Sequence, residues 1–254
     1  MTENNAQPDM QRWLNRIHLG DCIETMAQMP AESIDTIVTS PPYNLRAKGG
    51  VRAKKDNIRL WKNAALSEKG YAGVHTDDMP YDEYVEWQRE YISAMLRVLK
   101  PTGAIFYNHK YRIQKGLLQY RADIMEGFPV RQIIIWSRNN GFLFNDSFFL
   151  PTYEVIFLIT KPKFKLAHKA YNKKDVWHIK PERKNPHPAA FPLELARNCV
   201  ESTRGGIVLD PMMGSGTVAI AAEELGRDWI GIELSAEYCE LANNRIIAAR
   251  GEQA

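Results

Sequence analysis

The chain has 254 residues, of which 44% are hydrophobic and 25% charged, and its formal net charge is +3. This composition is ordinary for a globular protein with a buried apolar core, and it is not that of a disordered or fibrous chain. The mildly basic balance permits a nucleic-acid partner without requiring one, because the distribution of charge matters more than its sum.

Three cysteines, Cys22, Cys199 and Cys239, are scattered along the chain without a CxxC pair or a spacing typical of metal ligands. We therefore expect neither a disulfide framework nor a zinc site. The N-terminus lacks the basic and apolar regions of a signal peptide, and no apolar run is long enough to span a bilayer. These features indicate a reduced, cytoplasmic protein without a membrane segment or a metal.

Short apolar runs alternate with helical patterns from the start of the chain. Residues 1–12 are polar and are expected to be flexible. The pattern then predicts a strand at 16–19, a helix at 22–29 and a strand at 34–38.

The clearest predicted helix is 81–99, where large apolar residues recur at spacings of three or four and form a stripe typical of a buried face. That stripe consists of Tyr84, Trp87, Tyr91, Met95 and Val98. After it the pattern predicts a strand at 104–107, a helix at 111–125, and strands at 132–136 and 153–160. The last of these is a continuous apolar run, which suits the interior of a sheet.

A helix is predicted at 191–200, and a compact strand–loop–helix–strand unit follows it. The unit has a strand at 207–209, a loop at 210–216, a helix through Leu225 and a strand at 229–232, before a last helix at 236–250. Helices that alternate with short buried strands predict an α/β fold whose sheet is mostly parallel and doubly wound. We find no domain boundary, so the whole chain, 1–254, is expected to form a single domain.

The stretch Thr39-Ser40-Pro41-Pro42-Tyr43-Asn44 directly follows the predicted strand at 34–38. Two consecutive prolines end strand pairing, because each lacks a backbone N–H, fixes φ and keeps the preceding residue extended. The Ser-Pro-Pro-Tyr motif (residues 40–43) should therefore form a rigid corner with a hydroxyl, an aromatic ring and carbonyl groups that no neighbouring strand claims. Ligands bind at the carboxyl ends of strands in open α/β sheets, so this position suits a site. A Pro-Pro pair alone is more often a plain loop.

Two basic segments, 45–80 and 161–186, interrupt the alternation and contain few aliphatic residues. Long segments without secondary structure in compact domains are usually functional or disordered. A basic run is most often a solvated surface, but the first segment directly follows the Ser-Pro-Pro-Tyr motif. We therefore interpret both as basic loops inserted in the α/β domain, the first of them mobile and in contact with nucleic acid.

A second motif, Asp210-Pro211-Met212-Met213-Gly214-Ser215-Gly216-Thr217, lies between a predicted strand and a predicted helix. In this glycine loop (residues 210–217) the glycines allow a tight turn and a close ligand, and the following helix offers unpaired N–H groups. Glu233 ends the next strand, the position of an acid that accepts hydrogen bonds from ribose hydroxyls. The lack of a third glycine and of a G-K-[ST] sequence argues against a dinucleotide or ATP. The pattern indicates a nucleoside that carries a carboxylate or amine tail.

In this order the two motifs resemble those of DNA amino-methyltransferases, specifically the group whose catalytic motif precedes the S-adenosylmethionine motif (the β arrangement). Three further matches are Gly20-Asp21-Cys22, His187-Pro188-Ala189-Ala190-Phe191-Pro192 and Gly231-Ile232-Glu233. The resemblance covers roughly residues 16–248. It departs from the usual pattern at Ser40, Met212 and Phe191, where many relatives have Asp, Phe and Lys.

The resemblance implies a Rossmann-like methyltransferase fold that binds S-adenosylmethionine. The implied cofactor contacts are Asp21, Cys22, Asp210, Met212, Gly214, Ser215, Gly216, Thr217 and Glu233, and the implied catalytic residues are Ser40, Pro41, Pro42 and Tyr43. Residues 161–186 take the place where relatives keep target recognition. The implied substrate is double-stranded DNA with a flipped target base, and the resemblance also admits a homodimer and a cognate restriction nuclease as partners.

The exocyclic amino group of a base is a poor nucleophile, because its lone pair is shared with the ring. Hydrogen bonds from this group to Ser40 Oγ and the Pro41 carbonyl would draw the lone pair out of conjugation and direct it at a methyl sulfonium. Tyr43 would stack on the base, which must first leave the duplex. In the family, Asp at the position of Ser40 commonly goes with adenine N6 and Ser with cytosine N4, so cytosine N4 is slightly favoured over adenine N6.

Two other functions stay open. An enzyme of this fold could act on RNA, or a nucleic-acid-binding protein could keep the cofactor pocket without catalysis. A ring-carbon methyltransferase is disfavoured, because it needs a cysteine nucleophile, typically after a proline, and no cysteine here follows one. His109 and His178 are interpreted as structural or surface histidines.

Overall fold

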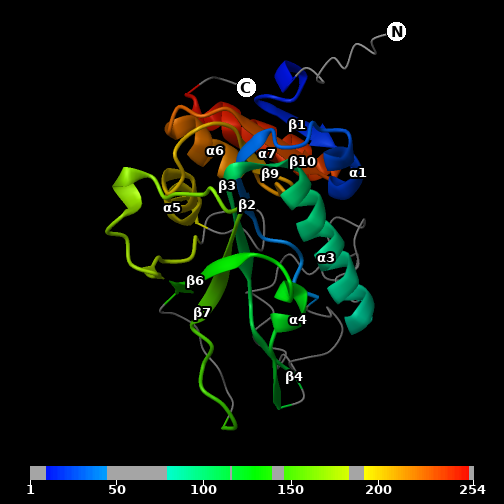
Figure 1. The fold of residues 1–254 in the computed structure, drawn as a ribbon, viewed down its shortest axis with the longest axis vertical. Coiled ribbons are helices and arrows are strands. Elements are labelled where there is room, and N and C mark those ends of the chain that lie inside the picture. Colours follow the sequence, from blue (N-terminus) through cyan, green and yellow to red (C-terminus); the bar gives the residue numbers. More distant parts are fainter. Residues whose placement is uncertain (1–9, 45–78, 115, 139–145, 183–191, 252–254) are drawn as a thin grey trace, which may run out of the picture.

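The computed structural model of the protein describes residues 10–44, 79–114, 116–138, 146–182 and 192–251. Eight strands form one sheet in the order β1-β10-β9-β2-β3-β7-β6-β8. They are β1 (Arg16–Leu19), β2 (Ile34–Thr39), β3 (Leu99–His109), β6 (Val130–Ser137), β7 (Tyr153–Thr160), β8 (Val176–His178), β9 (Val208–Asp210) and β10 (Trp229–Glu233). In Figure 1, β1, β9 and β10 lie at the upper end of the molecule and β6 and β7 lie below them.

The prediction of a mostly parallel α/β sheet is confirmed. Among the described strands of this sheet, only β7 runs antiparallel to its neighbours, β3 and β6, and the remaining pairs are parallel. The apolar run predicted as an interior strand at 153–160 is β7, which lies between those two strands. Every residue of β7 after Tyr153 is buried, as the continuous apolar pattern indicated.

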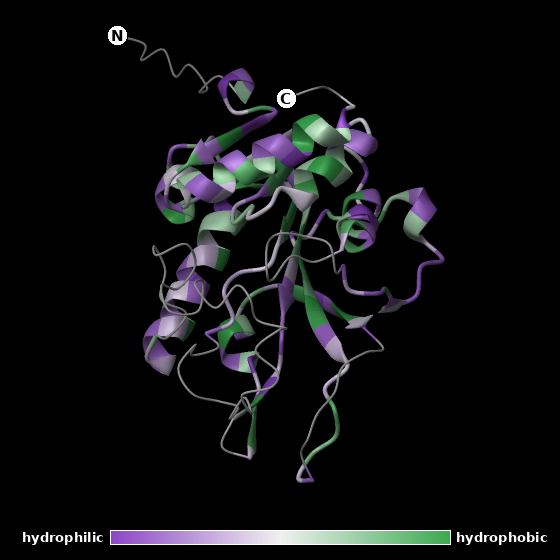
Figure 2. Ribbon diagram, turned by 180° about the vertical axis from the view of Figure 1, so that it is seen from behind, coloured by the Kyte–Doolittle hydropathy of each residue, from purple (hydrophilic) through white to green (hydrophobic). Residues whose placement is uncertain are grey.

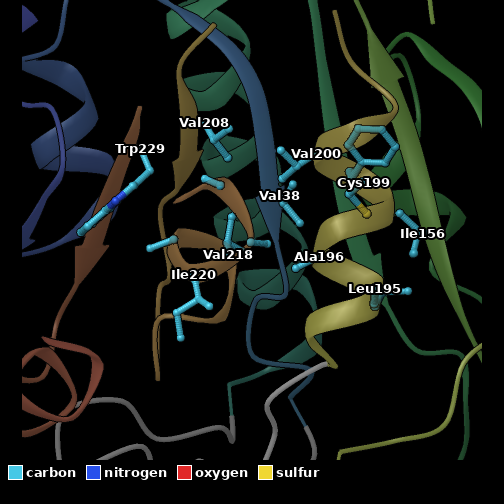
Figure 3. Packing of buried hydrophobic residues seen from close by; sticks show 14 of the residues in the cluster. Val38, Ile156, Leu195, Ala196, Cys199, Val200, Val208, Val218, Ile220 and Trp229 are labelled. Carbon is cyan, nitrogen blue, oxygen red and sulfur yellow. The ribbon is translucent and has the colours of Figure 1, made fainter. Parts of the chain in front are cut away.

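Helices cover both faces of the sheet, as a doubly wound fold requires. They are α1 (Cys22–Ala27), α3 (Tyr81–Val98), α4 (Ala122–Met125), α5 (Leu193–Glu201), α6 (Thr217–Glu224) and α7 (Ala236–Ala249). Residues of α5, α6 and α7 pack with Val38 and Phe106 in one apolar cluster, whereas α1, α3 and α4 pack with Ile37 and Tyr107 in the other. Successive strand residues point to opposite faces, which explains the split. Figure 3 shows Ala196 and Val200 of α5 directed toward Val38.

Helix α3 confirms the predicted amphipathic helix almost to its last residue. Of the predicted stripe, Tyr84, Tyr91, Met95 and Val98 are buried and Trp87 is half-buried. The opposite face carries exposed acidic residues, among them Glu83 and Glu90. In Figure 2 much of this helix is hydrophilic (purple), whereas the strands in the middle of the sheet are largely hydrophobic (green).

The helix predicted at 111–125 is wrong. The chain there forms a two-stranded antiparallel hairpin, β4 (Arg112–Gln114) and β5 (Leu117–Gln119), before the single turn of α4. Gly116 has a φ of +78°, in the left-handed region that a helix does not use. Leu117 and Leu118 are exposed, so they offer no face that a helix could bury against the core.

The two basic segments differ in how far the structure describes them. Residues 45–78 of the first lie outside the described residues, as do 1–9 of the N-terminus; residues 10–12 form a 3₁₀ turn, η1 (Met10–Arg12). The described part of the second segment contains a 3₁₀ turn, η3 (His168–Ala170), and the edge strand β8. Trp177 of β8 is buried beside β6, so this segment contributes to the core as well as to the surface.

None of the described helices combines the length and the hydrophobicity that a membrane crossing needs.

Candidate active site

The two motifs singled out in the sequence begin on neighbouring parallel strands. Ile37 of β2 pairs with Leu209 of β9, so the Ser-Pro-Pro-Tyr motif and the glycine loop leave the sheet at the same edge. Adjacent strands lie about 4.8 Å apart, which brings the two motifs side by side. Gly231 pairs with Asp210 and Leu19 with Glu233, so the ends of β1 and β10 complete the same edge. The predicted site residues at 21–22, 40–43, 210–217 and 233 are therefore brought together.

Asp21 fixes the first of these strand ends. Its Oδ1 accepts hydrogen bonds from the backbone N–H groups of Ile23 (2.8 Å) and Glu24 (3.0 Å), and thereby caps α1. The N–H of Gly20 donates to the carbonyl of Glu233 at 2.9 Å, which ties this turn to β10. Burial, assisted by the charge of Asp21, raises the pKa of the Cys22 thiol to about 12. A thiol held in this neutral form is not a nucleophile.

Asp210 ends β9 as a buried acid. Its Oδ1 accepts one hydrogen bond from the N–H of Met212 at 3.2 Å. Burial raises the pKa of Asp210 to about 8, and the negative charge of Glu233 adds to the rise. The proton is therefore held at neutral pH, and a cation placed beside this carboxyl would favour its ionised form.

Glu233 at the end of β10 is held by two backbone groups. Its Oε2 accepts from the N–H of Gly214 at 2.8 Å, and its Oε1 accepts from the N–H of Ser235 at 2.9 Å. Burial raises the pKa of Glu233. Each carboxylate oxygen has two lone pairs, so the group keeps acceptor capacity for ligand hydroxyls.

The glycine loop is shaped by positions that only glycine fits well. Gly214 and Gly216 have φ values of +52° and +80°, both in the left-handed region. A Cβ on Gly216 would lie 3.1 Å from that of Ala242. Arg245 of α7 donates to the carbonyl of Ser215 and, at 3.4 Å, to Oγ1 of Thr217, which begins α6. The loop is thus bound to both following helices.

The Ser-Pro-Pro-Tyr motif is held by helix α3 and by Arg121, the residue that precedes α4. The Tyr84 hydroxyl (2.9 Å) and Gln88 Nε2 (3.2 Å) both donate to the carbonyl of Pro42. The carbonyl of Tyr43 accepts from Arg121 at 3.3 Å. No neighbouring strand claims these carbonyls, as the sequence predicted, but a helix and an arginine do. The Pro42 carbonyl is therefore an anchor of the motif.

Both ends of the motif are fixed as well. Oγ1 of Thr39 lies 2.6 Å from the hydroxyl of Tyr91. Asn44, with a φ of +57°, exchanges two hydrogen bonds of 2.8 Å with the backbone of Met79. Its carbonyl accepts from Arg112 at 2.8 Å. The corner is therefore rigid over its whole length.

His109 supports this corner as a buried structural histidine, in agreement with its interpretation from the sequence. The Tyr84 hydroxyl donates to Pro42, so Nε2 of His109 donates to Tyr84 across 2.7 Å, while Nδ1 accepts from the N–H of Lys110. Burial and the charge of Arg121 lower the pKa of His109 to about 3, so the ring is neutral. It stacks on Tyr43 with ring centroids 4.8 Å apart. His178 lies exposed on β8.

Sequence reasoning missed a polar network around Ser40. Oγ of Ser40 lies 2.9 Å from the Tyr43 hydroxyl, which donates to Oε2 of Glu154 at 3.1 Å. Nδ2 of Asn108 lies 2.6 Å from the Tyr43 hydroxyl and 3.0 Å from Oε2 of Glu154. Arg138 pairs with Oε1 of Glu154 at 3.0 Å. The available signal was Glu154 itself, the single charged residue within the apolar strand β7.

Part of one further motif lies outside the described residues. Of the stretch 187–192, only Pro192 is described, where it precedes α5 as its N-cap. The remaining predicted site residues all lie on the carboxyl edge of the sheet.

Fold and site together define a Rossmann-like α/β protein with a nucleoside-type glycine loop beside a rigid polar corner. A family model described as DNA methylase, that of the N6/N4 methyltransferases, matches residues 34–244. The chain belongs to this DNA methylase family.

Individual relatives agree with this assignment. The chain is 30% identical to the Type II methyltransferase M.BglII of Bacillus subtilis, over 90% of this chain and 68% of the relative. It resembles the solved structure of a DNA modification methylase from Thermus thermophilus in complex with S-adenosyl-L-methionine, with a TM-score of 0.62 and 26% identity, over 92% of this chain and 93% of that one. The cytosine-N4-specific PvuII DNA methyltransferase has a TM-score of 0.69 at 18% identity, over 92% of this chain and 90% of that one, which bears on the fold alone.

Proposed function

We propose that this protein transfers a methyl group from S-adenosylmethionine to the exocyclic amino group of a flipped base in double-stranded DNA, with cytosine N4 slightly favoured over adenine N6. The observation that carries the proposal is the start of both motifs on neighbouring parallel strands at one edge of the sheet. A base held by the first motif would there meet a cofactor held by the second. Holding two reactants in line supplies much of the rate of a group transfer.

The residues at this edge fit S-adenosylmethionine. Glu233, fixed by two backbone N–H groups, has acceptor capacity left for ribose hydroxyls. Asp210 is a buried acid whose ionised form a cationic ligand would favour, and S-adenosylmethionine carries both an ammonium and a sulfonium group. The bound cofactor would lie along Gly214, Ser215, Gly216 and Thr217, with Met212, Asp21 and Cys22 beside them. When bound, the cofactor supplies an electrophilic methyl group.

The Ser-Pro-Pro-Tyr motif would hold the target amino group. Ser40 Oγ and the Pro41 carbonyl would accept its two N–H groups and leave the nitrogen lone pair free to attack. The rigidity that Pro42 gains from Tyr84 and Gln88 supports this role, since catalytic groups must be held within a fraction of an ångström. His109 supports the Tyr43 ring at 4.8 Å, so that the ring is held firmly for stacking on the base.

The flipped base would cost a few kcal/mol of unstacking, which contacts to DNA phosphates can offset. Exposed lysines of the second basic segment are available for such contacts: Lys163, Lys165, Lys169, Lys174 and Lys180. We propose that the chain acts as a single methyltransferase domain in which this segment and residues 45–80 contact DNA. A homodimer and a restriction nuclease with the same recognition sequence are the partners we propose.

The test is incubation with S-adenosylmethionine, labelled in the methyl group, and with duplex DNA or, in parallel, RNA, followed by digestion to nucleosides and mass spectrometry. We expect N4-methylcytosine, and N6-methyladenine would correct the base while keeping the reaction class. Label found only in RNA would show that the substrate is RNA and not DNA. Cofactor binding without any labelled nucleoside would contradict the proposed enzyme and favour a nucleic-acid-binding protein.

A further inference from the structure

The network around Ser40 connects the predicted amino-binding hydroxyl to a buried carboxylate on another strand. Glu154 is 7% exposed, and it lies on β7, two strands away from the strand that precedes Ser40. Tyr43 stands between them, 2.9 Å from Ser40 Oγ and 3.1 Å from Glu154 Oε2. The proposed function uses Ser40 and Tyr43 but gives no role to Glu154, which ends this continuous series of hydrogen bonds.

We propose that Glu154 orients the hydroxyl of Ser40 and takes up, through Tyr43, the proton that the target amino group loses on methylation. This inference rests on the proposed function and names a positioning residue for the same site. Glu154 acts on the base only through two other side chains.

The number of available hydrogens determines which group donates in each of these hydrogen bonds. Asn108 has two amide hydrogens, and its shortest contacts are with the Tyr43 hydroxyl (2.6 Å) and Glu154 Oε2 (3.0 Å), whereas Ser40 Oγ is 3.4 Å away. The opposite orientation of the amide would set its oxygen against the carboxylate, so the network itself selects the orientation observed. Asn108 therefore donates to Tyr43 and to Glu154.

The single hydrogen of the Tyr43 hydroxyl then goes to the carboxylate, which can only accept. It follows that Ser40 must donate its own hydrogen to the oxygen of Tyr43 across the 2.9 Å contact. The lone pairs of Ser40 Oγ are left to accept a hydrogen bond from the substrate. With a neutral side chain in place of Glu154, the Tyr43 hydroxyl would no longer have to donate there, and Ser40 would no longer have to donate to Tyr43.

The same chain gives the departing proton a balanced path. As the base nitrogen forms its bond to the methyl carbon and the carbon–sulfur bond breaks, the nitrogen becomes positively charged and its two hydrogens become acidic. The hydrogen that faces Ser40 passes to Ser40 Oγ, while the Ser40 hydrogen passes to Tyr43 and the Tyr43 hydrogen to Glu154; the second hydrogen stays on the nitrogen. The products are the neutral methylated amine, the two hydroxyls restored, and a protonated Glu154.

Charged groups on every element packed against Glu154 bear on this step. Arg138, which follows β6, binds the other carboxylate oxygen at 3.0 Å and holds the carboxylate in place. Lys110, which follows β3, lies near enough to Glu154 and Arg112 to feel their charges. Tyr43 comes from the Ser-Pro-Pro-Tyr motif. The carboxylate is thus surrounded by cations on two sides and by its proton donor on a third.

The experiment compares Glu154→Gln and Tyr43→Phe with the wild type in single-turnover methylation of DNA at saturating cofactor. We expect each variant to lower the rate about 100-fold, the typical scale of a lost proton-transfer contribution, with cofactor affinity unchanged. Because both act on one chain, the double variant should be no slower than the slower single one. Raising the pH should recover part of the rate of Glu154→Gln, since hydroxide can then accept the proton.

Glu223→Gln is the matched control, because Glu223 also pairs with an arginine, Arg250 at 2.9 Å, near the C-terminal end of α6. Its rate should equal that of the wild type. Infrared spectra after one turnover supply a readout other than rate, since the band of a protonated carboxyl should appear in the wild type and be missing in Glu154→Gln.

A wild-type rate in Glu154→Gln at every pH would overturn the proton transfer through Ser40 and Tyr43 to Glu154 (the relay). So would a double variant whose loss of rate equals the product of the two single losses. Either result would leave the proposed function standing. A wild-type protein that methylates no nucleic acid would overturn the proposed function and the relay with it. If Glu154→Gln does not fold, Tyr43→Phe with the wild-type rate overturns the relay by itself.

Discussion

The glycine loop and the Ser-Pro-Pro-Tyr motif leave neighbouring strands, yet they are held in different ways. Backbone conformation and backbone N–H groups dominate in the glycine loop: Gly216 adopts a left-handed φ, Met213 donates to the carbonyl of Ile232, and Gly214 donates to the carboxylate of Glu233. The side chain of Arg245 adds to these contacts. Side chains from distant segments fix the other motif, with Tyr84 from α3 and Glu154 from β7 as examples. One half of the site therefore depends mainly on backbone conformation and backbone N–H groups, and the other half mainly on side chains from distant segments.

This difference suggests a division of labour. A loop built from glycine conformations and backbone N–H groups suits a cofactor that the whole family shares. A corner held by side chains can be altered one contact at a time without changing the chain's path. Substitutions near the glycine loop should therefore affect cofactor affinity, and those near the Ser-Pro-Pro-Tyr motif should affect the chemical step.

The largest effect is expected for Ser40→Ala. The change removes the oxygen that we propose accepts a hydrogen bond from the substrate, so the single-turnover rate should fall about 10³-fold, within the usual range for such groups. The affinity for cofactor, measured by calorimetry, should stay within about twofold, because Ser40 belongs to the side-chain half of the site. Ser93→Ala, which removes a hydroxyl that bonds the Arg89 carbonyl on the exposed side of α3, is the control. Equal losses of rate and of affinity in Ser40→Ala would contradict the division.

Asp210→Asn should lower the affinity for cofactor far more than the rate of the chemical step. The substitution keeps the shape but removes the charge that a cationic cofactor would stabilise, so affinity should fall about 10- to 100-fold, as for a lost hydrogen bond to a charged group. The rate at saturating cofactor should change much less. Since Asp210 holds a proton in the free protein, the variant should unfold at the same temperature as the wild type or higher. A large fall in that temperature would mean that structural damage explains the lost affinity.

The pH dependence of cofactor binding tests the same residue without a substitution. The pKa of Asp210 is raised from 3.8 to about 8 in the folded protein, so a ligand that needs the ionised carboxylate must first displace a proton. Affinity should rise up to about tenfold per pH unit as the pH approaches 8 from below. Calorimetry in buffers of different ionisation enthalpy should detect the released proton. The dependence should be missing in Asp210→Asn, and its persistence there would assign it to another group.

The protonation of Asp210 affects the stability of the protein with the opposite sign: cofactor affinity rises with pH, whereas stability falls. A carboxyl whose folded pKa is raised binds its proton more tightly in the folded state, so this stabilisation is complete below about pH 4. It is lost as the pH rises from there toward 8. The wild type should therefore lose stability relative to Asp210→Asn over this interval, in denaturant titrations at stepped pH.

The sequence predicted those parts of the fold that local patterns determine. The strand at 153–160 and the helix beginning at Tyr81 follow from apolar periodicity, and the turns at Pro41 and Gly214 follow from residues with restricted or special φ values. The helix at 111–125 failed because Gly116 adopts a left-handed φ and the neighbouring leucines find no core to face.

What the sequence could not predict depends on pairings between distant residues. Strand β8 is stable because Trp177 is buried beside Trp136 of β6, a partner far earlier in the chain that periodicity within 161–186 cannot indicate. The Ser40 network exists because β3 and β7 are antiparallel, with Asn108 opposite Ile156. Register between strands is set by the assembled sheet, so Glu154 could be noticed in the sequence but not placed.

The smallest effect on the chemical step is expected for Gly231→Ala, which changes the backbone half of the site alone. A Cβ at this position would lie 2.2 Å from the sulfur of Met213 and 2.6 Å from its terminal carbon, and Met213 is itself buried. Overpacking of this kind should cost about 1–3 kcal/mol of unfolding free energy, because the methionine must move within a filled core. Met213 belongs to the glycine loop, so cofactor affinity should also fall, while the rate at saturating cofactor stays near that of the wild type. The added substitution Met213→Ala should recover part of the stability by making room for the new methyl group. A Gly231→Ala protein with wild-type stability would show that the loop yields easily, and would contradict the rigid backbone half on which the comparison depends.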